Sequence, residues 1–189
     1  MSVGRWILNE WPPSHEDRGA ALSDCDRYRY QLWRCWDRTL PPMGFVMLNP
    51  STANAMEDDP TIRRCIGFAR REGCGGIAVA NLSPWRATSP AEMDAAIARG
   101  SGTVTAHYQF VTEAMHHAEI VVMAWGALSS RPPRSRVWLA ENREAIAAAL
   151  FKDRPGRDLL CLGRNMDASP KHPLYLPLDA PLVLWRSDR

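Results

Sequence analysis

Lysine is almost absent from this chain, whose basic residues are 21 arginines and only two lysines, Lys152 and Lys171. With a formal net charge of +2, the sequence also lacks the excess of positive charge that a strong polyanion-binding surface requires. The arginine bias fits a GC-rich coding sequence. The alternative is an adaptation to phosphates and stacked bases, which suit the planar guanidinium. The class of ligand therefore stays open at this level.

Long apolar runs and targeting signals are missing as well. No run approaches the roughly 20 apolar residues that cross a bilayer, and the N-terminus has no basic region followed by an apolar segment. We therefore expect no membrane partner and a cytoplasmic location. The 189 residues can build a core of their own, so we predict an N-terminal arm over 1–24 and a single α/β domain over 25–189. Nothing in the sequence indicates the oligomeric state.

Well-known catalytic motifs are not found. There is no GxGxxG, Walker loop, HExxH, GxSxG or zinc-spaced Cys/His set. The five cysteines are odd in number and have no CxxC spacing, which indicates reduced, mostly buried thiols. Dinucleotide oxidoreduction, P-loop phosphoryl transfer and zinc catalysis are poorly supported, and we expect neither cofactor nor metal.

Apolar, β-rich runs alternate with helical patterns along the chain. This alternation predicts a three-layer α/β fold, with a mostly parallel central sheet of four to six strands and helices on both faces. The first strand, 28–36, is expected to carry its arginines on one face. The other predicted strands are 44–48, 75–82, 119–125, 158–163 and a short one near the end, and the predicted helices are 59–72, one from 89, one ending near 117, and 135–151.

The most informative stretch is 45–65, where an apolar strand stops abruptly at Asn49-Pro50. In a parallel sheet, the loops after the carboxyl ends of the strands gather at one edge and hold the ligands. Polar and aromatic residues follow each predicted strand, so we expect them to share one site. These candidates are Asn49, Pro50, Ser51 and Thr52, then Asn81, Trp85 and Arg86, then Trp125 and Gly126, and finally Asn165 and His172.

Each candidate also has a structural interpretation. Asn49 can cap a turn through its side chain, and His172 can be purely structural. Asp58 and Asp59 can bind Mg²⁺ through carboxylate oxygens, or they can cap the helix that begins at Pro60. The sequence leaves these alternatives open.

Two resemblances bear on function. The strings LNPSTANAMEDDPTIRRC, NLSPWRAT, MAWG, CLGRN and PKHPLY resemble a bacterial and phage family known only as a domain of unknown function, from about Cys25 to Trp185. More distantly, the order of these motifs is similar to that of the mismatch-specific type in the uracil-DNA glycosylase superfamily. That likeness implies a uracil-DNA-glycosylase-like fold and a pocket for a nucleobase or nucleotide.

The distant likeness also implies roles for single residues. Asn49 would orient a water molecule toward C1′ of the sugar, and His172 would hydrogen-bond the departing base. Asn81 would read the edge of a base taken out of its stack, and Trp85 or Trp125 would stack on it. The expected reaction is hydrolysis of an N-glycosidic bond. The alternatives are a non-catalytic nucleotide or single-stranded nucleic-acid binding module, and a metal-dependent nucleotide hydrolase that uses Asp58 and Asp59.

Overall fold

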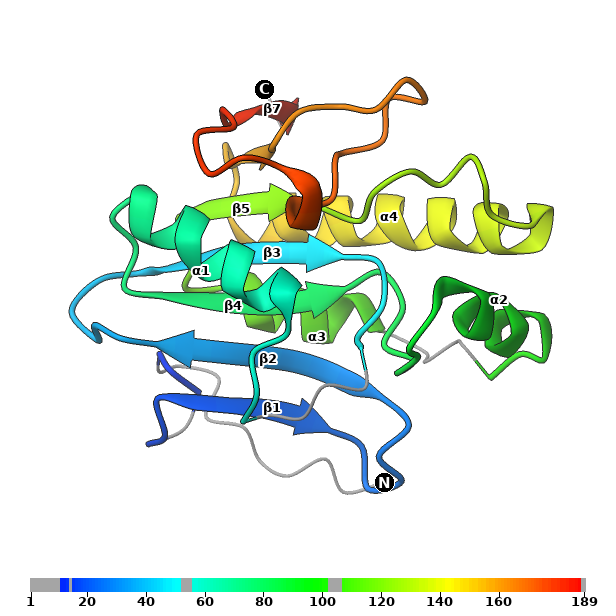
Figure 1. Ribbon diagram of the computed structural model, residues 1–189, viewed down its shortest axis with the longest axis horizontal. Coiled ribbons are helices and arrows are strands. Elements are labelled where there is room, and N and C mark those ends of the chain that lie inside the picture. The colour runs from blue at the N-terminus through cyan, green and yellow to red at the C-terminus, as the bar shows by residue number, and fades with distance from the viewer. Residues whose placement is uncertain (1–10, 14, 52–55, 102–106, 188–189) are drawn as a thin grey trace.

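The computed structural model describes residues 11–13, 15–51, 56–101 and 107–187 (Figure 1). The described chain opens with three consecutive strands, and strands and helices then alternate apart from one pair of successive helices. In chain order they are β1 (Arg18–Leu22), β2 (Arg29–Cys35), β3 (Pro42–Met47), α1 (Pro60–Arg71), β4 (Gly76–Asn81), α2 (Pro90–Ala98), α3 (His107–Met115), β5 (Ile120–Met123), α4 (Pro133–Asp153), β6 (Asp158–Cys161), the 3₁₀ turn η1 (Pro173–Tyr175) and β7 (Val183–Ser187).

The strands form one sheet in the order β1-β2-β4-β3-β5-β6-β7. The four inner strands β4, β3, β5 and β6 are parallel, while β1, β2 and β7 join through antiparallel pairings. The α/β class is confirmed, but the prediction of four to six mostly parallel strands is wrong, because the described sheet has seven strands and mixed pairing. The missed strand β1 lies within the predicted arm. Its sequence, RGAAL, is too short and too weakly apolar to stand out.

Helices cover both faces of the sheet, as predicted (Figure 1). On one face, α1 packs its buried residues against β3 and β4. On the other face, α2, α3 and α4 contribute to a second core against the opposite sides of the same strands. Strands buried on both faces read as continuous apolar runs, and all six residues of β3 are indeed buried.

Helix α1 begins beside the carboxyl end of β3. Its N-cap is Asp59, whose Oδ1 accepts the backbone N–H of Ile62 at 2.8 Å, and Pro60 occupies the first helical position. Gly73, with φ of +73°, follows the last turn in the left-handed conformation that favours glycine. These local signals direct the helix N-terminus toward the loop that follows β3.

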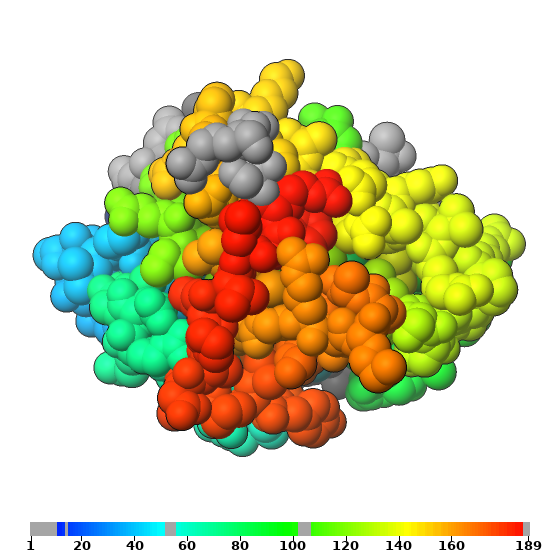
Figure 2. Space-filling model, turned by 90° about the horizontal axis from the view of Figure 1, so that it is seen from above, coloured from blue at the N-terminus to red at the C-terminus, as the bar shows by residue number. Residues whose placement is uncertain are grey.

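The C-terminal segment runs across the molecule between α1 and α4 (Figure 2). Nη1 of Arg71 donates at 2.6 Å to the carbonyl oxygens of Leu178 and Ala180, which ties the segment to α1. Nη1 of Arg186 lies 2.6 Å from a carboxylate oxygen of Glu144, which ties β7 to α4. The segment that follows His172 is therefore anchored to helices on both faces of the sheet.

The described residues also bear on the expectations about membrane-spanning segments and about the cysteines. None of the helices there combines the length and apolar character needed to cross a bilayer. All five cysteines lie in the described ranges and are free; Cys25 is exposed and the other four are buried.

Candidate functional site

A cavity of about 150 Å³ lies at the carboxyl ends of β3 and β4; we call it the strand-end cavity. Its volume is close to that of a cavity that holds one benzene-sized ring and well below that of a drug-sized ligand. A planar ring fits inside, while larger parts of a ligand must project through the opening. The lining residues are Arg29, Met47, Asn49, Ser51, Asp59, Thr61, Ile62, Asn81, Ala87, Thr88 and His172.

Asn49 is held at the cavity wall by its amide nitrogen. Nδ2 donates to the carbonyl oxygens of Pro50 at 3.1 Å and of Ala87 at 3.2 Å. Because both partners are acceptors, the nitrogen end of the amide must face them, and Oδ1 turns away. Asn49 fastens its own loop, and it still presents an acceptor oxygen that can orient a water or a ligand.

His172 enters the cavity from the loop that precedes η1. Its Nδ1 accepts the backbone N–H of Leu174 at 3.3 Å, so the proton of the neutral ring sits on Nε2. Burial lowers the pKa of His172, although the negative charge of Asp59 acts in the opposite direction. His172 is therefore a neutral donor near pH 7, through the nitrogen that Leu174 leaves free.

Asn81 is the last residue of β4, and only 2% of its surface is exposed. Its backbone carbonyl accepts from Nε2 of His107 at 2.6 Å, which fixes the end of the strand. Its side-chain amide has no hydrogen-bond partner among the described residues. A buried amide is expected to be hydrogen-bonded, so this one is available to a ligand that offers an acceptor beside a donor.

Arg29 is the residue that sequence reasoning overlooked. It opens β2 and is 5% exposed, and it lines the cavity together with Asp59 and Ile62. Its Nε is buried without a hydrogen-bond partner, and no ion pair within 4.0 Å joins Arg29 to a carboxylate in the described part of the chain. Burying an unpaired charge costs several kcal/mol, so a ligand that brings a negative charge would stabilise this arginine.

A bulge in β2 explains why Arg29 faces the cavity. Gln31 pairs with Ala21 and Arg29 pairs with Leu22, so Tyr30 has no partner on β1. Side chains alternate between the two faces of a strand, and one extra residue reverses that alternation. Tyr30 stacks on Phe110 of α3, with ring centroids 4.3 Å apart, while Arg29 turns to the face covered by α1.

Electrostatics at Arg29 favour an added negative charge. Desolvation lowers the pKa of Arg29 to about 10, which keeps it charged at neutral pH. Arg34 and Arg86 act in the same direction as burial, and only Asp59 opposes them. That carboxylate also accepts from Oγ of Ser51 at 3.0 Å and caps α1.

The two acids considered as Mg²⁺ ligands have other partners. Oδ1 of Asp58 lies 2.7 Å from Nε of the buried Arg34, and its Oδ2 lies 3.8 Å from Arg18. Asp59 serves as the helix cap. Across the described ranges, no group of three or more His, Cys, Asp or Glu side chains is arranged to hold a metal ion.

The cavity brings together four of the residues expected at the site, namely Asn49, Ser51, Asn81 and His172. Pro50 takes part through its carbonyl oxygen, which accepts from Asn49 and from the backbone N–H of Ala87. Thr52 lies outside the described residues.

The remaining expected residues do not line the cavity. Trp85 packs edge-on against Tyr28, with ring centroids 5.4 Å apart. Trp125 packs in the same manner on Trp185 at 5.3 Å, within the core on the α4 side. Nη1 of Arg86 donates to the carbonyl oxygen of Asp26 at 2.9 Å.

Gly126 and Asn165 support the loop of His172. The backbone N–H of Gly126 donates to the carbonyl oxygen of Pro170 at 3.1 Å, and Nδ2 of Asn165 donates to the same oxygen at 3.2 Å. A Cβ atom added to Gly126 would lie 3.5 Å from Cβ of His172. The two residues therefore position a cavity residue without lining the cavity themselves.

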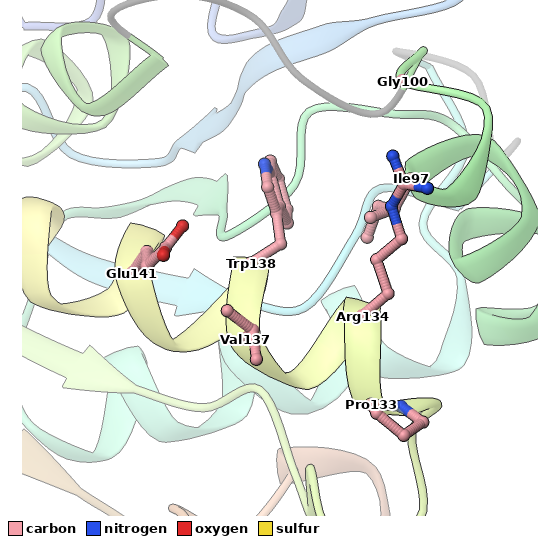
Figure 3. Close-up of a pocket in the computed structure, with 7 residues that line it drawn as sticks. All are labelled: Ile97, Gly100, Pro133, Arg134, Val137, Trp138 and Glu141. Atoms are coloured by element: carbon pink, nitrogen blue, oxygen red, sulfur yellow. The ribbon is translucent and has the colours of Figure 1, made fainter.

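A larger hollow of about 620 Å³ lies between the end of α2 and the first turns of α4 (Figure 3). Figure 3 shows that most of its side chains come from α4, with Trp138 and Val137 on successive positions. Arg134 and Glu141 are its charged residues, and it lacks the set of convergent polar groups found in the strand-end cavity. The strand-end cavity is therefore the better candidate site.

Comparisons with known proteins identify a family but no activity. No curated protein and no solved structure matched the chain. The model of one family, described as "Protein of unknown function (DUF1643)", matches residues 29–174. The match begins at Arg29 and ends just after His172, so it includes every residue that lines the cavity. The chain belongs to the DUF1643 family.

Proposed function

We propose that this protein recognises a nucleobase or nucleotide in the strand-end cavity and hydrolyses its N-glycosidic bond. The observation that carries the proposal is that Asn49, Asn81 and His172, from three distant parts of the chain, line one cavity. The order of motifs supports the same reaction through its likeness to mismatch-specific uracil-DNA glycosylases. The size of the cavity supports a single ring as the part that enters.

Polar groups of the cavity match the needs of this reaction. The C1′–N bond breaks and leaves electrons on the base, while a water oxygen bonds to C1′. The base takes up a proton, and the proton released by the water balances it. Nε2–H of His172 would donate to an oxygen of the departing base, where negative charge develops. Oδ1 of Asn49, which faces away from its backbone partners, would orient the water.

Recognition would depend on Asn81. An amide offers a donor and an acceptor side by side, and these pair with a ring edge that carries a carbonyl next to an N–H. Because the side chain is almost fully buried, a ring without this edge would leave the amide unsatisfied, which costs about 1–3 kcal/mol. The preferred base is therefore a single ring with a keto-imino edge, such as uracil.

The test is incubation with single- and double-stranded oligonucleotides that contain uracil, hypoxanthine or 5-hydroxymethyluracil, followed by alkaline cleavage at abasic sites. We expect abasic product from at least one substrate. Asn49→Ala should reduce the rate about 100-fold or more, the scale of a lost transition-state hydrogen bond. His172→Phe should do the same.

Matched controls come from the same residue types outside the cavity. Asn142, whose Nδ2 donates to the carbonyl oxygen of Trp138 in α4, serves for Asn49, and the half-exposed His116 serves for His172. Asn142→Ala and His116→Ala should leave the rate unchanged. If none of the substrates yields abasic sites, hydrolysis is rejected. Saturable binding of the same oligonucleotides without product would then favour the non-catalytic binding module.

A further inference from the structure

We propose that Arg29 binds an anionic oxygen of the ligand, so that the strand-end cavity selects a negatively charged ring or phosphate over a neutral base. This inference rests on the proposed function for the identity of the ring, but the anion site itself depends only on Arg29. It assigns a ligand-binding role to a residue that neither the motif likeness nor the family match identifies.

Unsatisfied hydrogen-bonding capacity is the first argument. A guanidinium has five N–H donors. The side chain of Arg29 is almost completely buried, its Nε has no partner, and it donates no hydrogen bond to any described residue. The equally buried Arg34 and Arg157 also keep buried nitrogens without a partner, but each of them donates other side-chain hydrogen bonds, Arg34 to Asp58 and Arg157 to backbone carbonyl oxygens. Arg29 differs because its guanidinium makes no such bond among the described residues and lines the cavity.

The direction of the side chain is the second argument. The bulge at Tyr30 breaks the regular β1–β2 pairing and turns Arg29 toward the cavity. Bulges are frequent beside binding sites because they redirect a side chain. If the side chain of Arg29 had pointed to solvent, water would have hydrated its charge. Because it points into the cavity, the geometry favours an anionic ligand as its partner.

The surrounding charges are the third argument. Arg34 and Arg86 add positive potential at Arg29, against a single carboxylate, Asp59. The charge of Arg34 is matched by Asp58, whereas no carboxylate of the described residues lies within ion-pair distance of Arg29. A carboxylate or phosphate oxygen placed beside the guanidinium would form the strong, charge-assisted type of hydrogen bond.

Asn81 limits which kind of ligand can bring an anionic oxygen to Arg29. Both side chains line a cavity with room for about one ring, so base and phosphate cannot enter together. A pyrimidine bearing a carboxylate satisfies the amide of Asn81 with its keto-imino edge and Arg29 with its charge. We therefore choose orotate as the anionic probe, uracil as the neutral ring and inorganic phosphate as the anion without a ring.

The experiment measures binding of these three probes by calorimetry at pH 7, with the full chain and with Arg29→Met. We expect orotate to bind the wild type about 10- to 100-fold more tightly than uracil, the range for a hydrogen bond to a charged group. Arg29→Met should abolish this preference while it leaves uracil binding within about threefold. If phosphate binds and orotate does not, the anion that Arg29 takes is a phosphate in place of a ring carboxylate.

Thermal unfolding of the two proteins without ligand separates a binding role from a structural one. Methionine has similar length and no charge, so removing an unpaired buried guanidinium should keep or raise the melting temperature. A melting temperature several degrees lower would show that Arg29 supports the fold, and would overturn the inference. The inference would also be overturned if orotate bound equally to both proteins, or if neither orotate nor phosphate bound to the wild type. Uracil binding that persists in either case would leave the proposed function intact.

Discussion

Nε2 of His107 lies 2.6 Å from the backbone carbonyl oxygen of Asn81, so a buried imidazole of α3 fixes the last residue of β4. A carbonyl oxygen only accepts, which places the proton of the neutral ring on Nε2. Nδ1 is buried without a partner among the described residues. Desolvation lowers the pKa of His107 to about 4, although the contact with Asn81 acts in the opposite direction.

This contact predicts an acid-sensitive fold. The pKa of His107 is lower in the folded state than its ordinary value of about 6.5, so the unfolded chain binds more protons between pH 4 and 6.5. The free energy of unfolding should rise with pH across that window and stay level above it. The measurement is urea unfolding at pH 7 and pH 4. Between these values the free energy of unfolding should fall by about 3 kcal/mol more in the wild type than in His107→Gln, whose amide still donates to Asn81. Parallel pH profiles would contradict this assignment.

The ion pair between Arg34 and Asp58 should contribute strongly to stability. The side chain of Arg34 is 4% exposed, and removing its carboxylate leaves the charge buried. Asp58→Ala should lower the free energy of unfolding by about 3 kcal/mol. The control is Asp17→Ala, which removes the exposed partner of Arg38 and should cost less than about 1 kcal/mol. Denaturant titration of both variants measures the difference, and equal losses would show that burial of the pair is unimportant.

Gly126 should matter for the site beyond its effect on stability. With φ of +82°, it adopts a conformation in which a side chain costs about 1–2 kcal/mol. Gly156, with φ of +77° and open space where a Cβ would lie, has the same backbone cost. Both alanine variants should lose similar stability. Only Gly126→Ala should weaken binding in the cavity, because the backbone N–H of Gly126 supports the loop that carries His172. Unchanged ligand affinity in Gly126→Ala would show that Gly126 does not position His172 for binding.

Asp59 should oppose anion binding at Arg29. Asp59→Asn keeps a side chain that caps α1 about equally well, so stability should change little. It removes the carboxylate whose charge acts on Arg29, so orotate should bind about tenfold more tightly, the size of a partly screened charge interaction. Asp17→Asn, outside the cavity, is the control for net charge. Weaker orotate binding in Asp59→Asn would mean that the carboxylate itself contacts the ligand.

Features set by local sequence could be predicted. The continuous apolar run that became β3 and the cap, proline and glycine of α1 are written in neighbouring residues. The grouping of Asn49, Asn81 and His172 followed from one rule, that loops after parallel strands meet at one edge. Their roles stay predictions.

Features set by distant pairing could not be predicted. The direction of β2 and β7 depends on which strand each one meets, and RGAAL became β1 only because β2 lies beside it. Trp125 lies two residues after the end of β5, and alternation sends its side chain to the α4 side, where Trp185 covers it. The place of Arg29 in the cavity could not be predicted for the same reason, since the face on which its side chain lies depends on the pairing of β2 with β1.

The bulge at Tyr30 makes the charge of the cavity depend on strand pairing as well as on residue type. If Tyr30 paired with Leu22 in place of Arg29, regular alternation would put Tyr30 on the α1 side and Arg29 on the α3 side, although every amino acid stayed the same. Removing Tyr30, by contrast, would leave Arg29 opposite Leu22 and keep it on the cavity side. A homologue that closes this bulge without a change in length would carry the same arginine and lack the cation in its cavity, which a comparison of residue types alone would not detect.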